Sequence, residues 1–153
     1  MSAVLRSAAR FEPMAETDLK AVLDIEQGIY AFPWTPGNFR DSIRAGYSCW
    51  VCRDGRELIG YAVLMLAAGE AHLLNLSIAA HRQRQGHGRR LLNHLIENAR
   101  KHGAQLLFLE VRPSNEAAKQ LYAGYDFRQA GVRRDYYPAH GGREDALVLA
   151  LNL

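Results

Sequence analysis

The sequence RQRQGHGR, residues 82–89, lies between a predicted strand and the clearest helical pattern of the chain. The glycines at positions 86 and 88 allow the backbone to approach a ligand, and a helix start offers unpaired N–H groups and a positive dipole end. We therefore expect an anion site here, to which Arg84 and Arg89 add charge. An ordinary glycine turn with solvated charges is the alternative. The helix is predicted over residues 88–102, where apolar residues recur at helical spacing: Leu91, Leu92, Leu95, Ile96 and Ala99.

This segment fits neither of the two common phosphate-binding motifs. The pattern G-x-x-x-x-G-K-S/T is absent from it. Leu91 stands where the third glycine of a dinucleotide-binding G-x-G-x-x-G would lie. The segment therefore belongs to neither of these motif classes.

Strand and helix patterns surround this segment in a regular order. Before it, a short strand over residues 10–14 precedes two helices. We expect Thr17 to cap the first helix, which runs to about Tyr30, and Thr35 to cap the second, with Pro36 in its first turn. Strands are predicted over residues 47–53, 57–67 and 71–79, with turns between them.

The long helix is expected to end at Gly103, a residue suited to a left-handed cap. An apolar strand over 105–111 and a helix from Asn115 to about Tyr122 follow, and then two strands over 127–137 and 144–151. This order predicts an α/β (α+β) domain of three layers. Its sheet is expected to be mixed but mostly antiparallel, with helices on both faces.

The 153 residues are 48% hydrophobic and 23% charged, a globular composition that excludes extensive disorder. We expect a single domain over residues 1–153. Apolar runs such as residues 61–68 are far shorter than the roughly 20 residues of a membrane span. The first ten residues lack the apolar segment of a secretory signal, so a cytoplasmic protein is expected. The net charge of +3 permits a phosphorylated ligand without requiring nucleic acid.

Cys49 and Cys52 form a C-x-x-C pair within a strand pattern, whereas a redox-active pair would lie at a helix start. Three residues apart on a strand, the two thiols point to opposite faces. We therefore expect buried, reduced, structural cysteines. The six histidines show no H-x-x-x-H or Cys/His ligand spacing, so no metal is expected.

Three residues after the long helix could carry chemistry. Glu110 ends the apolar strand, and a partly dehydrated carboxylate there is suited to act as a general base. An ion pair with Arg112 is the alternative for this residue. Tyr122 could donate a proton to a leaving group or could simply pack in the core. Asn115 could contact a ligand or serve only as a helix cap.

Aromatic and charged residues alternate in RRDYYP, residues 133–138, and acidic residues follow at Glu144 and Asp145. This pattern is compatible with a peptide groove, with RNA binding or with the exposed side of a hairpin. RNA binding through phosphate contacts would require a steep dependence on salt.

Several stretches together resemble the GCN5-related N-acetyltransferase (GNAT) superfamily and, more specifically, its RimI family. Members of that family acetylate the N-terminal alanine of a ribosomal protein of the small subunit. The Q-x-x-G-x-G of residues 83–88 marks the superfamily. The resemblance spans nearly the whole chain in the same order. The other stretches that carry it are AFPWT (31–35), LLNLSI (73–78), FLEVRPSN (108–115) and RRDYYP with GREDALVLAL (133–151).

The resemblance implies that acetyl-CoA binds in a groove opened by a splayed pair of central strands. Asn115 is then expected to contact the cofactor arm. Glu110 would be the base, acting through water, and Tyr122 the acid that protonates the departing thiolate. The backbone of Leu76, Ser77 and Ile78 would hold the pantetheine arm and the acetyl group. The pyrophosphate would lie against Arg84, Gln85, Gly86, His87, Gly88 and Arg89. The substrate terminus would be gripped by Phe32 and Trp34 together with Tyr136 and Tyr137.

The turn after Tyr122 departs from the pattern of the family, which is LY-x-x-x-G-F. Asp126 stands at the glycine position, and Gly124 lies two residues earlier. Aspartate tolerates a left-handed backbone better than most residues, so we expect the turn to persist.

The sequence thus predicts an acetyl-CoA-dependent N-α-acetyltransferase, expected to be a monomer. Its expected substrate is the N-terminal alanine of small-ribosomal-subunit protein eighteen, with no direct role for nucleic acid or membrane. Other protein N-termini, a lysine or a small-molecule amine are the alternatives within the same enzyme class. Outside that class, the alternatives are an RNA- or ribosome-binding module and a CoA-binding regulator without catalysis.

Overall fold

Within residues 9–153, the part of the chain that the computed structural model describes, seven strands form one sheet. Their order is β1-β2-β3-β4-β5-β7-β6, and every neighbouring pair is antiparallel except β4 and β5. The expectation about a secretory signal falls largely on residues 1–8, outside the described residues. The strands are β1 (Arg10–Pro13), β2 (Ser48–Asp54), β3 (Glu57–Ala67), β4 (Glu70–Ile78), β5 (Leu106–Val111), β6 (Arg128–Ala139) and β7 (Gly142–Asn152).

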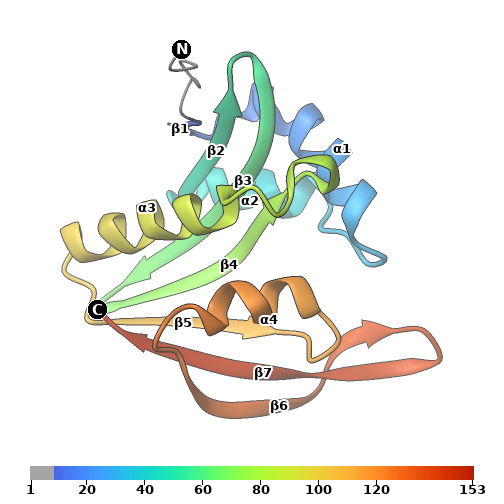
Figure 1. Cartoon of the computed structure of the whole chain (residues 1–153), viewed down its shortest axis with the longest axis vertical. Helices are drawn as coiled ribbons and strands as arrows, with labels where there is room; N and C mark the ends of the chain where they lie inside the picture. The colour runs from blue at the N-terminus through green and yellow to red at the C-terminus, as the bar shows by residue number, and fades with distance from the viewer. Residues whose placement is uncertain (1–8) are drawn as a thin grey trace, which may run out of the picture.

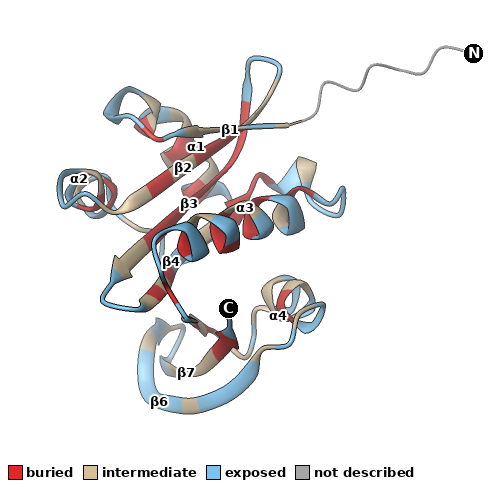
Figure 2. Ribbon diagram, turned by 90° about the vertical axis from the view of Figure 1, so that its left-hand side faces the viewer, coloured by how far each residue is buried: buried red, intermediate tan, exposed pale blue. Residues whose placement is uncertain are grey.

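Helices cover both faces of the sheet, as the sequence predicts (Figure 1). Turning the molecule by 90° separates the layers, with α1 and α2 on one side of the strands and α3 and α4 on the other (Figure 2). The helices are α1 (Leu19–Ile29), α2 (Pro36–Arg44), α3 (His87–Lys101) and α4 (Glu116–Ala123), with short 3-10 turns at Glu16–Asp18 and Ala80–Arg82.

Local sequence signals set most helix ends. Thr35 Oγ1 accepts a hydrogen bond from Asn38 N (3.1 Å), and Pro36 occupies the first turn of α2, which confirms the predicted cap. Gly103 has the expected left-handed backbone (φ 79°) after α3. The prediction for Thr17 is wrong. Residues 16–18 form a tight 3-10 turn in which an Asp18 carboxylate oxygen accepts from Ala15 N (2.8 Å), so α1 begins only at Leu19.

Each face of the sheet buries its own apolar cluster. Under α3 and α4, buried residues of α3 such as Leu91 and Leu95 pack with Leu64 and Leu107 of the sheet. Under α1 and α2, the cluster is formed by Met14, Leu19, Val22, Phe39, Cys49, Val51, Leu58, Tyr61 and Val63. The two clusters fix the helices against the strands and leave the strand ends to form the site.

Cys49 and Cys52 are free and buried, as predicted. Burial raises the pKa of each thiol to about 11, so both are protonated at neutral pH. Across residues 9–153, no three His, Cys, Asp or Glu side chains are grouped so that they could hold a metal ion. In the same part of the chain, no helix has the length and apolarity needed to cross a membrane.

The turn after α4 closes without a left-handed residue at Asp126. Gly124 N donates to Leu121 O (3.3 Å), and Tyr125 N donates to Tyr122 O (3.0 Å). The ring of Phe127 then packs edge-on against the ring of Tyr122, with 5.5 Å between the centroids. The departure from the family pattern at Asp126 therefore leaves Tyr122 packed against the sheet.

Candidate active site

The central strands β4 and β5 separate partway along their length (Figure 1). They run parallel and pair at only four positions, of which the last joins Leu73 to Leu109. A bulge at Leu74 follows in β4. From there β4 continues along β3 alone as far as Ile78, and the backbone edge that β5 would have covered faces the gap between them. The expected splayed strand pair is present.

The turn before α3 has the geometry of an anion site. Gly86 and Arg84 both have left-handed backbones, with φ values of 84° and 61°. The first helical hydrogen bond runs from Arg90 N to Gly86 O (3.1 Å), so the amides that precede Arg90 in the first turn have no acceptor within the helix. These amides and the helix dipole favour a negatively charged group at this point.

Two side chains hold this turn against the sheet. Gln83 Nε2 donates to Ile78 O (3.0 Å) at the end of β4. Arg82 pairs with Glu57 (2.7 Å) and with Asp54, both at the β2–β3 turn. Arg82 therefore fixes the turn to the β2–β3 turn, and it also lines the first cavity described below.

A cavity of about 400 Å³ connects the free edge of β4, the start of α3 and one side of α4. Gln85, also predicted to contact the cofactor, is not among its lining residues, and its side chain accepts a 3.4 Å hydrogen bond from Arg82. The predicted cofactor residues that do line the cavity are Leu76, Ser77, Ile78, Arg84, Gly86, His87, Gly88, Arg89 and Asn115.

A second cavity, of about 300 Å³, continues from the first toward the carboxyl end of β5. Both predicted catalytic residues, Glu110 and Tyr122, line it, and Tyr122 lines the first cavity as well. Tyr122 therefore lies where the two cavities meet. Five residues line both spaces: Tyr30, Leu76, Asn115, Ala118 and Tyr122.

Glu110 is the second-last residue of β5 with its side chain 26% exposed, and its carboxylate pairs with Arg133 Nε at 2.9 Å. The alternative pairing with Arg112 is wrong. β5 ends at Val111, and Arg112 beyond it pairs with Glu144 (3.2 Å) and donates to Pro138 O (2.8 Å). Glu110 lines both the second cavity and a third one, and its ion-pair partner Arg133 lines the third.

Tyr122 is buried, and burial raises the pKa of its hydroxyl well above the ordinary value of 10.0. The neighbouring Tyr30 and Tyr137 act in the same direction. The hydroxyl is therefore protonated at neutral pH and able to donate. Asn115 serves as the cap of α4, since its side chain accepts from Ala118 N (3.1 Å), and it also lines both cavities.

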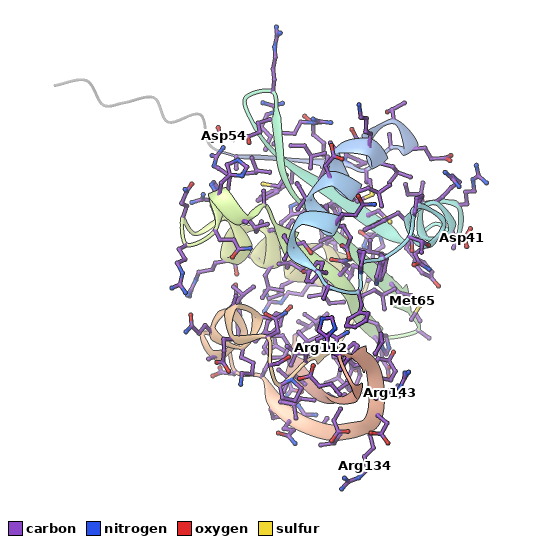
Figure 3. The ribbon with its side chains drawn as sticks, turned by 90° about the vertical axis from the view of Figure 1, so that its right-hand side faces the viewer. Asp41, Asp54, Met65, Arg112, Arg134 and Arg143 are labelled. Atoms are coloured by element: carbon purple, nitrogen blue, oxygen red, sulfur yellow. The ribbon has the colours of Figure 1, made fainter. Side chains whose placement is uncertain are left out.

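Aromatic side chains from two distant segments border the second cavity. Phe32 and Trp34 come from the loop between α1 and α2, and Tyr137 comes from β6. Arg112 lies over the rings of Tyr137 (4.3 Å) and Phe32 (5.7 Å), in the gap between the two halves of the molecule (Figure 3). Tyr136 instead borders a third cavity, of about 510 Å³, on the far side of Glu110. The predicted substrate residues thus surround Glu110 on two sides.

Among the polar residues that line the second cavity, sequence reasoning gave no site role to Glu26, Tyr30, Asn75 and Arg112. Glu26 is almost fully buried, at 2% exposure. The sequence does indicate that Glu26 is buried, because it lies on the apolar face of the first helix, seven residues after Leu19 and four after Val22. Tyr30 and Asn75 gave no such signal, since each is ordinary in its own segment.

Comparisons with known proteins agree with this geometry. Residues 19–127 match the sequence profile of the Acetyltransferase (GNAT) family. The chain is 42% identical over 135 residues to ribosomal protein bS18-alanine N-acetyltransferase of Escherichia coli (strain K12), covering 88% of this chain and 91% of that protein. It is 38% identical to the enzyme of the same name from Salmonella typhimurium, covering 90% and 93% of the two chains.

A solved structure agrees over most of the chain. The crystal structure of the ribosomal-protein-S18-alanine N-acetyltransferase from Escherichia coli superimposes with a TM-score of 0.87 at 39% identity, covering 94% of this chain and 93% of that one. With the profile matching more than half of the chain and these relatives aligned over most of their length, the chain belongs to the GNAT family of acetyltransferases and is an N-acetyltransferase.

Proposed function

We propose that this enzyme transfers the acetyl group of acetyl-CoA to the N-terminal α-amine of a protein, with the N-terminal alanine of ribosomal protein bS18 as its substrate. The observation that carries the proposal is the pair of connected cavities with Tyr122 at their junction. One cavity offers an anion site at the start of α3, and Glu110 lines the other. The substrates named for relatives with up to 42% identity support the choice of protein.

Acetyl-CoA fits the residues of the first cavity. Its pyrophosphate needs donors and positive charge, and the turn before α3 offers backbone amides beside Arg84 and Arg89. Its pantetheine arm needs a strand-like edge, and Leu76, Ser77 and Ile78 present the free edge of β4. Bound there, acetyl-CoA would supply a thioester carbonyl activated toward amines. Asn115, Gly86, His87 and Gly88 complete this part of the proposed site, and no metal is assigned to it.

The proposed chemistry is direct attack of the amine nitrogen on the thioester carbon. Glu110 takes a proton from the amine through a water molecule. Tyr122 Oη gives its proton to the sulfur as the C–S bond breaks, and a backbone N–H of β4 stabilises the carbonyl oxygen. The ion pair with Arg133 Nε (2.9 Å) holds the Glu110 carboxylate in place.

An α-amine suits a single carboxylate base better than a lysine does. With a pKa near 8, removing the proton of an α-amine at pH 7 costs about 1 kcal/mol, whereas a lysine near 10.4 costs about 4.6 kcal/mol. Phe32 and Trp34 on one side and Tyr136 and Tyr137 on the other would hold the peptide that carries this amine. We further propose that the whole chain, 1–153, is one acetyltransferase domain that acts as a monomer in the cytoplasm.

Mass spectrometry on two peptides tests the proposal. One peptide begins with a free alanine and copies the N-terminus of ribosomal protein bS18. The other has the same sequence with a blocked terminus and one internal lysine. Incubated with the enzyme and acetyl-CoA, only the first peptide is expected to gain one acetyl group.

Two other outcomes would change the substrate proposed for the enzyme. Acetylation of the second peptide alone would make the enzyme a lysine acetyltransferase. If neither peptide gained an acetyl group while acetyl-CoA still bound in a titration, the ribosomal substrate would be wrong.

A further inference from the structure

A buried carboxylate, Glu26, lies at the side of the second cavity. Three hydrogen-bond donors satisfy it within the described part of the chain, and no cation is paired with it. Tyr61 Oη (2.7 Å) and Asn75 Nδ2 (3.0 Å) donate to Oε1, and the backbone N–H of Trp34 donates to Oε2 (2.9 Å). A buried charge of this kind is costly unless every bond is made, so its partners are held tightly.

The three donors come from separate parts of the chain. Tyr61 belongs to β3 and Asn75 to β4, whereas Trp34 belongs to the loop between α1 and α2. That loop also carries Phe32 and is one wall of the proposed peptide site. One carboxylate therefore ties the loop to the sheet.

The bond from Asn75 to Glu26 belongs to a wider set of hydrogen bonds, called the ladder below, that involves Glu26, Tyr30, Asn75 and Ser77. Glu26 lies in the last turn of α1 and Tyr30 directly follows the helix, whereas Asn75 and Ser77, two residues apart, share one face of β4. Tyr30 Oη lies 2.6 Å from Ser77 Oγ, and Ser77 Oγ donates to Asn75 Oδ1 (2.7 Å). The ladder thus joins α1, through Glu26, and the residue that follows it, Tyr30, to two neighbouring positions of β4.

The ladder lies along the part of β4 that does not pair with β5. Pairing with β5 ends at Leu73, and the bulge at Leu74 follows, so Asn75 and Ser77 belong to the free edge. The neighbouring backbone is the proposed wall for the acetyl group and pantetheine arm. Hydrogen bonds from α1 support this edge on the side of the sheet away from α3.

We propose that Glu26 is a positioning residue that sets the two walls of the site relative to each other. Its Oε2 holds the peptide-side loop through Trp34, and its Oε1 holds the cofactor-side strand through Asn75. The inference rests on the proposed function for the identity of the two walls, and its hydrogen bonds are independent of that assignment.

Glu26→Gln is the first test, because glutamine keeps the shape but has one acceptor oxygen where glutamate has two. With that oxygen toward Tyr61 and Asn75, the amide NH₂ opposes the N–H of Trp34, and the tie to the loop is lost. We expect the KM for the alanine peptide to rise about tenfold, the worth of one hydrogen bond of this kind. The KM for acetyl-CoA should stay within twofold, and kcat should change less than the peptide KM.

Asn75→Ala breaks the other tie. It removes the donor to Glu26 Oε1 and the acceptor of Ser77 Oγ, so the KM for acetyl-CoA is expected to rise more than the KM for the peptide. Tyr61→Phe is the comparison variant, since it removes a bond to the same carboxylate oxygen and a contact with Ser77 but keeps the bonds of Glu26 to Trp34 and Asn75. Its thermal stability should fall while both KM values stay within twofold of the wild type.

Amide hydrogen exchange on the wild type does not depend on a variant that folds. The N–H of Trp34 should exchange slowly for a loop amide, and fast exchange would overturn the proposal. The proposal also fails if Glu26→Gln leaves both KM values within twofold, or changes them no more than Tyr61→Phe does. If the wild type acetylated neither peptide, the proposed function would be contradicted. Exchange of the Trp34 N–H would still test its hydrogen bond to Glu26.

Discussion

At the scale of single residues, Glu110 has two candidate roles. It can act as the base of the reaction, or its ion pair with Arg133 can serve only the structure. Glu110→Gln keeps the shape and removes the basic oxygen, so kcat should fall by about 10²-fold or more. The dissociation constant for acetyl-CoA, measured by titration calorimetry, should stay within twofold. Arg133→Gln breaks the same ion pair but keeps the carboxylate, and it separates the two roles. If Glu110→Gln abolished acetyl-CoA binding, the role of base would be wrong.

Tyr122 is tested by removing a single oxygen. Tyr122→Phe keeps the edge-on contact with Phe127, so the fold should persist, while kcat should fall about 10²-fold because no proton reaches the leaving sulfur. Burial raises the pKa of this hydroxyl above 10.0, so the wild-type kcat should not decline between about pH 7 and 9 through loss of this proton. Activity of Tyr122→Phe within threefold of the wild type would show that Tyr122 only packs.

At the scale of elements, the start of α3 depends on the left-handed backbone of Gly86. An alanine there strains the turn by about 1 kcal/mol and adds a methyl group beside the proposed pyrophosphate site. We expect Gly86→Ala to weaken acetyl-CoA binding about tenfold in a titration. Gly69→Ala is the control, because Gly69 has a similar φ of 76° in the β3–β4 turn. Equal weakening of acetyl-CoA binding by both variants would mean that general strain, not the anion site, explains the loss.

The elements themselves were largely predictable, because their signals are local. Thr35 followed by Pro36, and the apolar spacing that ends at Gly103, each depend on neighbours within a few residues. Thr17 failed as a cap because the carboxylate of Asp18 formed a competing local hydrogen bond to Ala15 N. Where polar residues compete within one turn, the sequence alone does not decide which one caps.

The candidate site was predictable where the sequence resembles a known family or where a residue lies near the end of a strand or helix. Glu110 and Tyr122 are of this kind, and their meeting at one cavity follows from the order of β5 and α4. The partner of Glu110 and the burial of Glu26 depend instead on chain segments brought together from far apart. Glu26 meets Asn75 across 49 residues of sequence, and no local pattern encodes that contact.

At the scale of the whole molecule, two histidines on α3 make stability depend on pH. Burial lowers the pKa of both His87 and His94 below the ordinary 6.5. Nearby arginines, Arg90 first, also lower the pKa of His87. His94 packs against the rings of Phe11 (4.8 Å) and Trp50 (4.3 Å), and its Nε2 is buried without a hydrogen-bond partner in the described residues. The folded protein therefore binds protons at these sites less readily than the unfolded chain does.

The direction in which stability changes with pH follows from this difference in proton binding. Well above pH 6.5 both histidines are neutral in both states, and their contribution to stability is constant. As pH falls through that value, the unfolded chain gains protons first and stability is lost until the folded pKa is passed. His94→Phe keeps a ring between Phe11 and Trp50, so its melting temperature should fall less between pH 8 and 5.5, by a few degrees. His102→Gln, which changes an exposed histidine after the same helix, is the comparison variant. An identical pH dependence in His94→Phe and the wild type would place the acid sensitivity elsewhere in the molecule.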